Sequence, residues 1–150
     1  MEGRLYLRDE ELDAGAAIII AAEKRLARAM QDVLKDAPIN QGELDVLMGI
    51  RAMPGLTVRQ MRERLAMTVP TFARILGQLD QKGLIEKTPS DKDLRARVLQ
   101  LSTKGEKRLA PFAACLRDVL RTAYRDAGAE HVAGARAVLG AVIAHEDGHD

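Results

Sequence analysis

The segment Thr68–Ser102 constrains the fold of this chain more than any other part of the sequence. Its first half carries apolar residues three and four positions apart, the spacing of the buried face of an amphipathic helix: Phe72, Ile75, Leu76 and Leu79. Pro70 suits the first position of such a helix, because its missing N–H would have no partner there. Gly83 follows Lys82 and accepts the left-handed conformation that commonly ends a helix. The pattern therefore predicts a helix from Pro70 to Lys82.

The second half of the same segment predicts a two-stranded hairpin. Leu84-Ile85 begins one strand, and Thr88–Asp91 has the composition of a turn, with a proline that cannot donate to a sheet. Arg95–Leu101 alternates, which predicts a second strand with Ala96 and Val98 facing inward. A helix that runs into a hairpin with a basic tip is the outline of a winged helix.

Charge is distributed unevenly along the chain, although the total is only +1. Residues 51–108 carry 13 basic and 6 acidic side chains, a net charge of +7. Residues 1–50 have a net charge of −4, and residues 109–150 have −2. A basic centre that coincides with the predicted helix and hairpin favours binding to nucleic acid over a merely solvated surface.

Composition argues against several classes of protein. Aromatic residues make up only 3% of the chain and tryptophan is absent, which argues against stacking on unpaired bases. Ala14–Ala22 is apolar but far shorter than the ~18 residues of a membrane span, and acidic residues precede it, unlike a signal peptide. The single cysteine, Cys115, allows no internal disulfide and fits a reducing cytoplasm. We expect one cytoplasmic domain without a membrane partner.

Helix-start patterns place most of the other elements. A helix is predicted from Asp9 to about Asp36, because apolar residues recur every three or four positions along it. A Ser, Thr or Asn followed three residues later by Glu or Gln predicts a capping box. This pattern occurs at Asn40, Thr57 and Thr103, so we expect a helix to begin at each of them.

The long helices near the two ends of the chain carry unusual features. Pro111 lies beyond the first turn of the helix that begins at Thr103, which predicts a kink or a restarted helix. The first long helix has an Ile18–Ile20 cluster beside its apolar stripe, so we expect it to pack against a second surface such as a partner chain. Glu130–Ala144, rich in Ala and Val, predicts a last helix.

Four groups of residues in the centre of the chain form a pattern that is known from one family. They are Leu56-Thr57-Val58, Val69-Pro70-Thr71 with Arg74, Leu79–Ile85, and Asp93–Ala96 followed by Val98, Leu101-Ser102 and Gly105. In these groups the chain resembles the MarR family of winged-helix transcription regulators. The last group, an Asp-x-Arg wing followed by a Leu-Ser helix start, is the most specific part of the resemblance.

The resemblance implies a mainly α fold with a small β-hairpin wing, and long dimerisation helices at both termini. Residues 38–102 would form the winged helix-turn-helix DNA-binding part, and residues 1–37 and 103–150 the dimerisation helices of the same single domain. A homodimer is implied, with a pseudo-palindromic duplex whose half-sites lie about one helical turn, roughly 34 Å, apart. The implied role is a repressor that a small-molecule effector releases from DNA.

The predicted DNA contacts combine this resemblance with charge. Arg74 on the recognition helix contacts either guanine or a phosphate. The resemblance implies that Arg95 reaches the minor groove or the backbone, and that Asp93 orients the wing through a buried ion pair. Basic residues elsewhere are expected to contact phosphates, which set affinity rather than sequence choice. The predicted DNA-binding set is Arg59, Thr68, Thr71, Arg74, Lys87, Lys92, Arg95 and Arg97, with solvent as the alternative for Arg97.

Other interpretations have weaker support. Cys115 is an alternative sensing thiol of a redox-responsive regulator, but a core cysteine fits its apolar neighbours better. His145 and His149 have a zinc-binding spacing, but Gly148 lies between them near the chain end, which favours a frayed tail. A winged helix used as a protein-interaction module is a further alternative, against which the net charge of +7 argues. No phosphate loop, nucleophile elbow or ligand-spaced cluster occurs, so we expect neither an enzyme nor a metal or cofactor.

Overall fold

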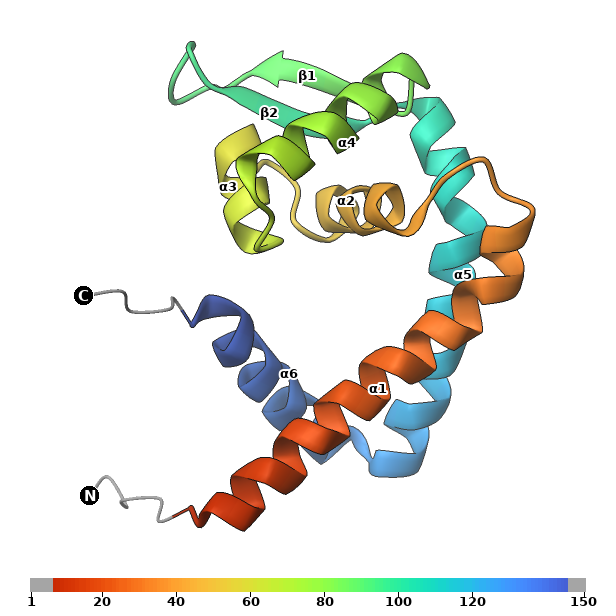
Figure 1. Ribbon diagram of the computed structural model, residues 1–150, viewed down its shortest axis with the longest axis vertical. Coiled ribbons are helices and arrows are strands. Elements are labelled where there is room, and N and C mark those ends of the chain that lie inside the picture. The colour runs from red at the N-terminus through yellow and green to blue at the C-terminus, as the bar shows by residue number, and fades with distance from the viewer. Residues whose placement is uncertain (1–6, 146–150) are drawn as a thin grey trace.

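The computed structural model describes residues 7–145 and contains, within them, six helices and one two-stranded antiparallel sheet (Figure 1). In chain order the elements are α1 (Asp9–Lys35), α2 (Gln41–Ala52), α3 (Val58–Arg64), α4 (Val69–Gln81), β1 (Ile85–Pro89), β2 (Arg97–Leu101), α5 (Thr103–Ala127) and α6 (Ala129–Ala144). This is the mainly helical winged helix-turn-helix architecture that the sequence predicts. None of the described helices is both long and apolar enough to cross a membrane.

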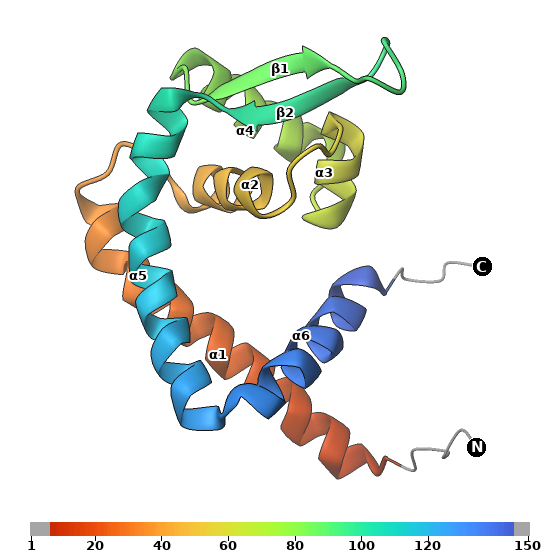
Figure 2. The same ribbon diagram turned by 180° about the vertical axis from the view of Figure 1, so that it is seen from behind.

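Most of the hydrophobic core comes from the part of the chain that runs from α2 to the first half of α5. In Figures 1 and 2, α2 lies beneath α4 and the hairpin, with α3 at one end and α5 at the other. The large side chains that fill this space are fully buried: Leu44, Leu47, Met61, Phe72, Leu79, Leu84, Leu99, Leu109 and Phe112. Close packing resists distortion, so this core gives α4 and the hairpin a firm base.

Side-chain caps fix where the helices of the core begin. The predicted capping boxes at Asn40 and Thr57 are both confirmed, with reciprocal hydrogen bonds to the third helical residue. The predicted cap at Thr103 is wrong, because the cap is Ser102, whose Oγ accepts the N–H of Gly105 at 2.9 Å. Thr68 caps α4 in the same way, which puts Pro70 at the second rather than the first helical position.

The hairpin exists, but its inward face differs from the prediction. β1 pairs with β2 from Ile85–Leu101 to Pro89–Arg97, so the first strand extends into the predicted turn and the second begins two residues late. The buried residue of β2 is Leu99, which is 1% exposed. The backbone before α3 also adds to the other edge of β2, where the N–H of Leu99 donates to the carbonyl of Leu56. Apolar residues occur on both faces of this strand, and a shift of one residue exchanges the faces.

The helices at the two ends form an arm beside the core. α1 lies against α5, and α6 folds back from the end of α5 (Figures 1 and 2). Of the predicted kink or restart at Pro111, the restart is wrong, since α5 runs through it as one helix. Burial of Leu109 and Phe112 on either side offsets the lost hydrogen bond. Only Met30 of α1 is buried, and α6 has no buried residue, so much of the apolar surface of the arm has no cover in this chain.

Candidate nucleic-acid interface

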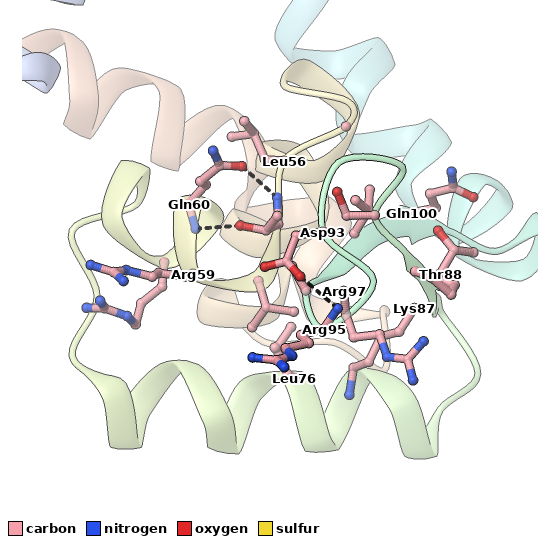
Figure 3. Close-up of a pocket in the computed structure, with 18 of the residues that line it drawn as sticks. Leu56, Arg59, Gln60, Leu76, Lys87, Thr88, Asp93, Arg95, Arg97 and Gln100 are labelled. Carbon is pink, nitrogen blue, oxygen red and sulfur yellow. Dashed lines mark hydrogen bonds between the residues drawn. The ribbon is translucent and has the colours of Figure 1, made fainter.

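An open groove of about 1620 Å³ lies between α3, α4 and the hairpin. In Figure 3, Arg59 lies at one side on α3, and Lys87, Arg95 and Arg97 lie at the other, with α4 running along the edge. Six cationic side chains line it: Arg59, Arg62, Lys87, Lys92, Arg95 and Arg97. Three carboxylates, those of Glu63, Asp91 and Asp93, line it as well, so the groove carries a net positive charge. Such a surface attracts a polyanion.

The first turn of α4 is exposed and its hydroxyl groups are already paired. Thr68 Oγ1 donates to Thr71 Oγ1 at 2.9 Å and accepts the N–H of Thr71 at 3.4 Å. Both side chains are accessible, as are Val69, Pro70 and Ala73 beside them. This end of the helix is therefore a small, mostly uncharged surface that can approach another molecule closely.

Arg74 is the one cationic side chain on α4. It lies opposite the buried face of the helix and is exposed. Its Nη1 donates to Gln78 Oε1 one turn further along, at 3.3 Å. This weak exposed hydrogen bond holds the guanidinium along the helix surface and leaves its other donors available.

The tip of the hairpin is basic and exposed, and Asp93 shapes it differently from the prediction. The predicted buried ion pair of Asp93 is wrong: the side chain is exposed, and its Oδ1 accepts the backbone N–H of Arg95 at 2.9 Å. A carboxylate two residues before an N–H closes a local turn of this kind readily. Lys92 and Arg97 are exposed on either side of this turn, so Asp93 still orders the loop that carries the cationic residues.

An ion pair on α3 holds one of the predicted DNA contacts. Arg59 Nε donates to Glu63 Oε1 at 2.9 Å, although the Arg59 side chain is 83% exposed, and Arg62 Nη2 lies 3.5 Å from the same oxygen. The hydrogen bond from Arg59 lowers the pKa of Glu63 and raises that of Arg59. Glu63 thus stays ionised and competes with any phosphate for Arg59.

One buried ion pair escaped the sequence analysis. Glu43 is fully buried, and Lys82 Nζ donates to its Oε1 and Oε2 at 2.7 and 2.8 Å. The sequence identified Glu43 only as part of a capping box and Lys82 only as a helix end. A usable signal existed, because a carboxylate on the apolar face of α2 requires a cationic partner.

The remaining candidates lie away from the groove. Cys115 on α5 is half-buried, and its Sγ donates to the carbonyl of Ala29 at 3.0 Å, which joins α5 to α1. His149 lies outside the described residues, so the His145–His149 pair has no description here. Between residues 7 and 145, no cluster of three or more His, Cys, Asp or Glu side chains could hold a metal ion.

Known proteins share both the sequence and the fold of this chain. A family model described as the MarR family matches residues 37–96. The HTH-type transcriptional regulator PetP of Rhodobacter capsulatus is 31% identical over 142 residues, which cover 95% of this chain and 86% of that protein.

Solved structures with lower identity share the fold. NadR in complex with 4-hydroxyphenylacetate has a TM-score of 0.77 at 17% identity, covering 97% of this chain and 100% of that one. A mutant MarR from E. coli complexed with operator DNA has a TM-score of 0.61 at 21% identity, covering 91% and 99%. With the match to the family model and to PetP, the chain belongs to the MarR family of DNA-binding transcription regulators, which are not enzymes.

Proposed function

We propose that two copies of this chain form a dimer that binds a pseudo-palindromic operator, with α4 of each copy in a major groove and the hairpin against the adjacent minor groove. One observation carries this proposal: the cationic side chains of α3 and the hairpin line one groove beside α4, and the first turn of α4 and Arg74 are exposed next to it. Arg74 and the first turn of α4 read bases, and Arg95 enters the minor groove or contacts the backbone. Phosphate contacts come from the rest of the set, namely Arg59, Lys87, Lys92 and Arg97, while Asp93 orders the wing.

The dimer would form through the arm. Residues 1–37 and 103–150 would supply the dimerisation helices, and residues 38–102 the DNA-binding part. The support is the uncovered apolar surface: Leu12, Ile18 and Ile20 on α1, and Val138, Val142 and Ile143 on α6, are each at least half exposed. A single chain rarely leaves so many large apolar side chains in water without a partner.

The finer role we propose is that of a cytoplasmic repressor that a small molecule releases from its operator. Support comes from relatives alone: NadR was solved with 4-hydroxyphenylacetate, and PcaV from Streptomyces coelicolor, with a TM-score of 0.59 at 20% identity, was solved with its natural ligand. A compound that binds only the native protein must raise its thermal midpoint, so a thermal-shift screen of small aromatic acids tests for an effector.

The test of the main proposal is selection of bound duplex fragments from genomic DNA, followed by affinity measurements against salt. We expect enrichment of a pseudo-palindrome and a linear fall of log affinity with log salt. Arg74→Ala should weaken binding at least about tenfold and relax base preference at one position per half-site. Arg95→Ala should weaken binding to all sequences. It should also reduce the salt slope, which is the slope of log affinity against log salt concentration, by about one unit for each phosphate that the side chain no longer neutralises.

Arg121→Ala is the matched control for both variants. Arg121 is an exposed arginine on α5 whose one ion-pair partner in residues 7–145 is Asp118, so its loss removes the same charge far from α4. If no fragment is enriched at low salt and no salt slope appears, the DNA-binding dimer is refuted for this chain. Binding of a protein partner by the winged helix would then explain the function of this chain better.

A further inference from the structure

The C-terminal end of α4 is joined to the α1–α2 connection by one side chain. Lys82 immediately follows α4, and its Nζ donates to the carbonyl of Pro38 at 2.9 Å as well as to both carboxylate oxygens of Glu43. Glu43 in turn accepts the backbone N–H of Asn40 at 2.9 Å. A single ammonium group thus links the recognition helix to the residues that connect α1 with α2.

The same end of α4 is also joined to the start of α5. Lys104 Nζ donates to the carbonyl of Lys82 at 2.7 Å, and Ser102 Oγ donates to the carbonyl of Gly83 at 2.6 Å. The backbones are in direct contact there, since a Cβ placed on Gly105 would lie 2.0 Å from the carbonyl oxygen of Leu84. The start of α5 and the connection that follows α1 therefore both meet the chain at this end of α4.

The opposite end of α4 has one weaker link to another element among the described residues, since Arg62 Nη1 on α3 donates to the carbonyl of Met67 at 3.4 Å. Its other side-chain hydrogen bonds are local, from Thr68 to Thr71 and from Arg74 to Gln78. The core holds the buried face of α4 from Phe72 to Leu79, and the stronger polar links to other elements lie at its C-terminal end. The exposed side of its first turn, which would meet the bases, is farthest from these links.

We propose that Lys82, through Glu43 and Pro38, is a positioning residue that sets the angle of the recognition helix relative to α1 and α5, and with it the spacing between half-sites that the dimer accepts. This inference rests on the proposed operator-binding dimer. α4 has 13 residues, so at ~1.5 Å per residue a tilt of about 5° at Lys82 moves its first turn by nearly 2 Å. Two copies double this shift, which then matches the ~3.4 Å step of one base pair.

The contact suits this role because it is specific and poorly replaceable. The Glu43 side chain is 1% exposed, and Lys82, whose side chain is 38% exposed, is the only cation paired with it in the described part of the chain. A buried charge without its partner is costly, so the carboxylate strongly favours the one helix orientation in which Lys82 reaches it. The exposed ion pairs elsewhere in the chain impose no comparable restraint.

The test measures affinity against half-site spacing. The operator selected by the wild-type protein is rebuilt with one or two base pairs added to or removed from its centre, and each duplex is titrated with wild type, Lys82→Met, Glu43→Gln and Lys82→Arg. The affinity of the wild-type protein should fall about tenfold or more when the spacing is wrong by one base pair, because the two copies can no longer bind their half-sites at the same time. Lys82→Met and Glu43→Gln should both flatten this profile, to about threefold or less. Lys82→Arg, which keeps the cation, should restore most of the preference.

Glu86→Gln is the matched control, since Glu86 lies on β1 outside the proposed dimerisation helices, is exposed, and has no ion-pair partner in residues 7–145. It should leave the spacing profile unchanged. Thermal midpoints are measured in parallel, and Glu43→Gln, which keeps the shape of the side chain, serves if Lys82→Met does not fold.

Two results would overturn this inference and leave the proposed dimer intact. One is a uniform loss of affinity at every spacing with a lower thermal midpoint, which marks a merely structural contact. The other is a uniform change of opposite sign in Lys82→Met and Glu43→Gln, which marks a simple charge effect on DNA. A wild-type protein with no preference for any paired half-sites would instead refute the proposed dimer, and this inference with it.

Discussion

At the scale of single residues, the state of Arg59 decides how much charge α3 offers to DNA. Glu63 holds Arg59 at 2.9 Å and shares Arg62, so two cations are partly neutralised before any phosphate arrives. We expect Glu63→Gln to tighten operator binding about two- to fivefold, a change within the range of exposed ion pairs. The salt slope should steepen as well, because more cations become available to phosphates. Fluorescence anisotropy with labelled operator measures both quantities.

The matched control for Glu63→Gln is Glu86→Gln. Glu86 lies on β1, is exposed, and has no ion-pair partner in residues 7–145, so its loss changes the net charge equally without releasing an arginine. Equal tightening in both variants would mean that net charge alone is responsible. The pH response has a definite sign: the pKa of Glu63 is lowered, so the pair persists as pH falls until the folded-state pKa is reached, and Arg59 is released only below it.

Residue-level predictions from the sequence are confirmed where a partner is close along the chain, as at the caps Asn40 and Thr57. The Arg59–Glu63 pair was not predicted, although it has the i, i+4 spacing that stabilises helices. The Glu43–Lys82 pair was not foreseen, because 39 residues separate its members and only the fold brings them together. Asp93 was misjudged because its preference for closing a local turn outweighed the expected ion pair.

At the scale of elements, the turn between α3 and α4 contains a strained residue. Ala66 has a φ of +50°, in the left-handed region where a Cβ costs roughly 1–2 kcal/mol. We expect Ala66→Gly to raise the free energy of unfolding by about 0.5–1 kcal/mol, since the relief of strain exceeds the added entropy of the unfolded chain. Ala66→Val should lower it, because a β-branched residue fits this conformation least. Urea denaturation of both variants measures the difference.

Gly77→Ala provides a comparison for the turn. Gly77 lies within α4, has an ordinary helical φ, and has open space where a Cβ would be added. Alanine should stabilise the helix there by up to about 1 kcal/mol. The strain argument for Ala66 would be wrong if Ala66→Gly were as destabilising as a glycine in an ordinary helix.

Elements differ in how far the sequence alone determined them. The helices were predicted well because periodicity and capping are local, with each cap reaching an N–H three residues along. The hairpin was predicted to exist, but the inward residue of β2 was not, because Val98 and Leu99 put apolar side chains on opposite faces and only the packing of the core selects Leu99. The continuity of α5 through Pro111 likewise depends on tertiary burial that no local pattern reports.

At the scale of the whole molecule, a carboxylate of the winged-helix part, Asp45, lies near enough to the arm for a negative charge there to act on it. Asp45 on α2 keeps some contact with water, yet neighbouring protein displaces enough of it to raise the pKa of this carboxyl. A hydrogen bond from Gln41 opposes the shift, and the negative charge of Glu23 on α1 adds to it. A carboxyl with a raised folded-state pKa favours the folded protein when it is protonated, and this contribution is lost as pH rises through the folded-state pKa.

We therefore expect Asp45→Asn to raise the thermal midpoint slightly at pH 7, by an amount worth less than about 1 kcal/mol for so accessible a group. The difference from wild type should vanish below the ordinary aspartate pKa of ~3.9. Thermal melts between pH 3 and pH 8, with Asp126→Asn on α5 as the control, measure it. If Asp45→Asn raised the thermal midpoint by the same amount at every pH, the loss of the charge on Asp45 would not be the cause.

The exposed apolar surface of α6 has a consequence for the concentration at which the protein is active in a cell. α6 buries none of its side chains in its own chain, and its interior glycines, Gly134 and Gly140, weaken its intrinsic preference for helix. α5 contacts one side of it, and in the proposed dimer a second copy covers more of it, which it does only by mass action. Abundance itself would act as a signal: below the dimer dissociation constant, the regulator would disappear from its operators without any effector being present.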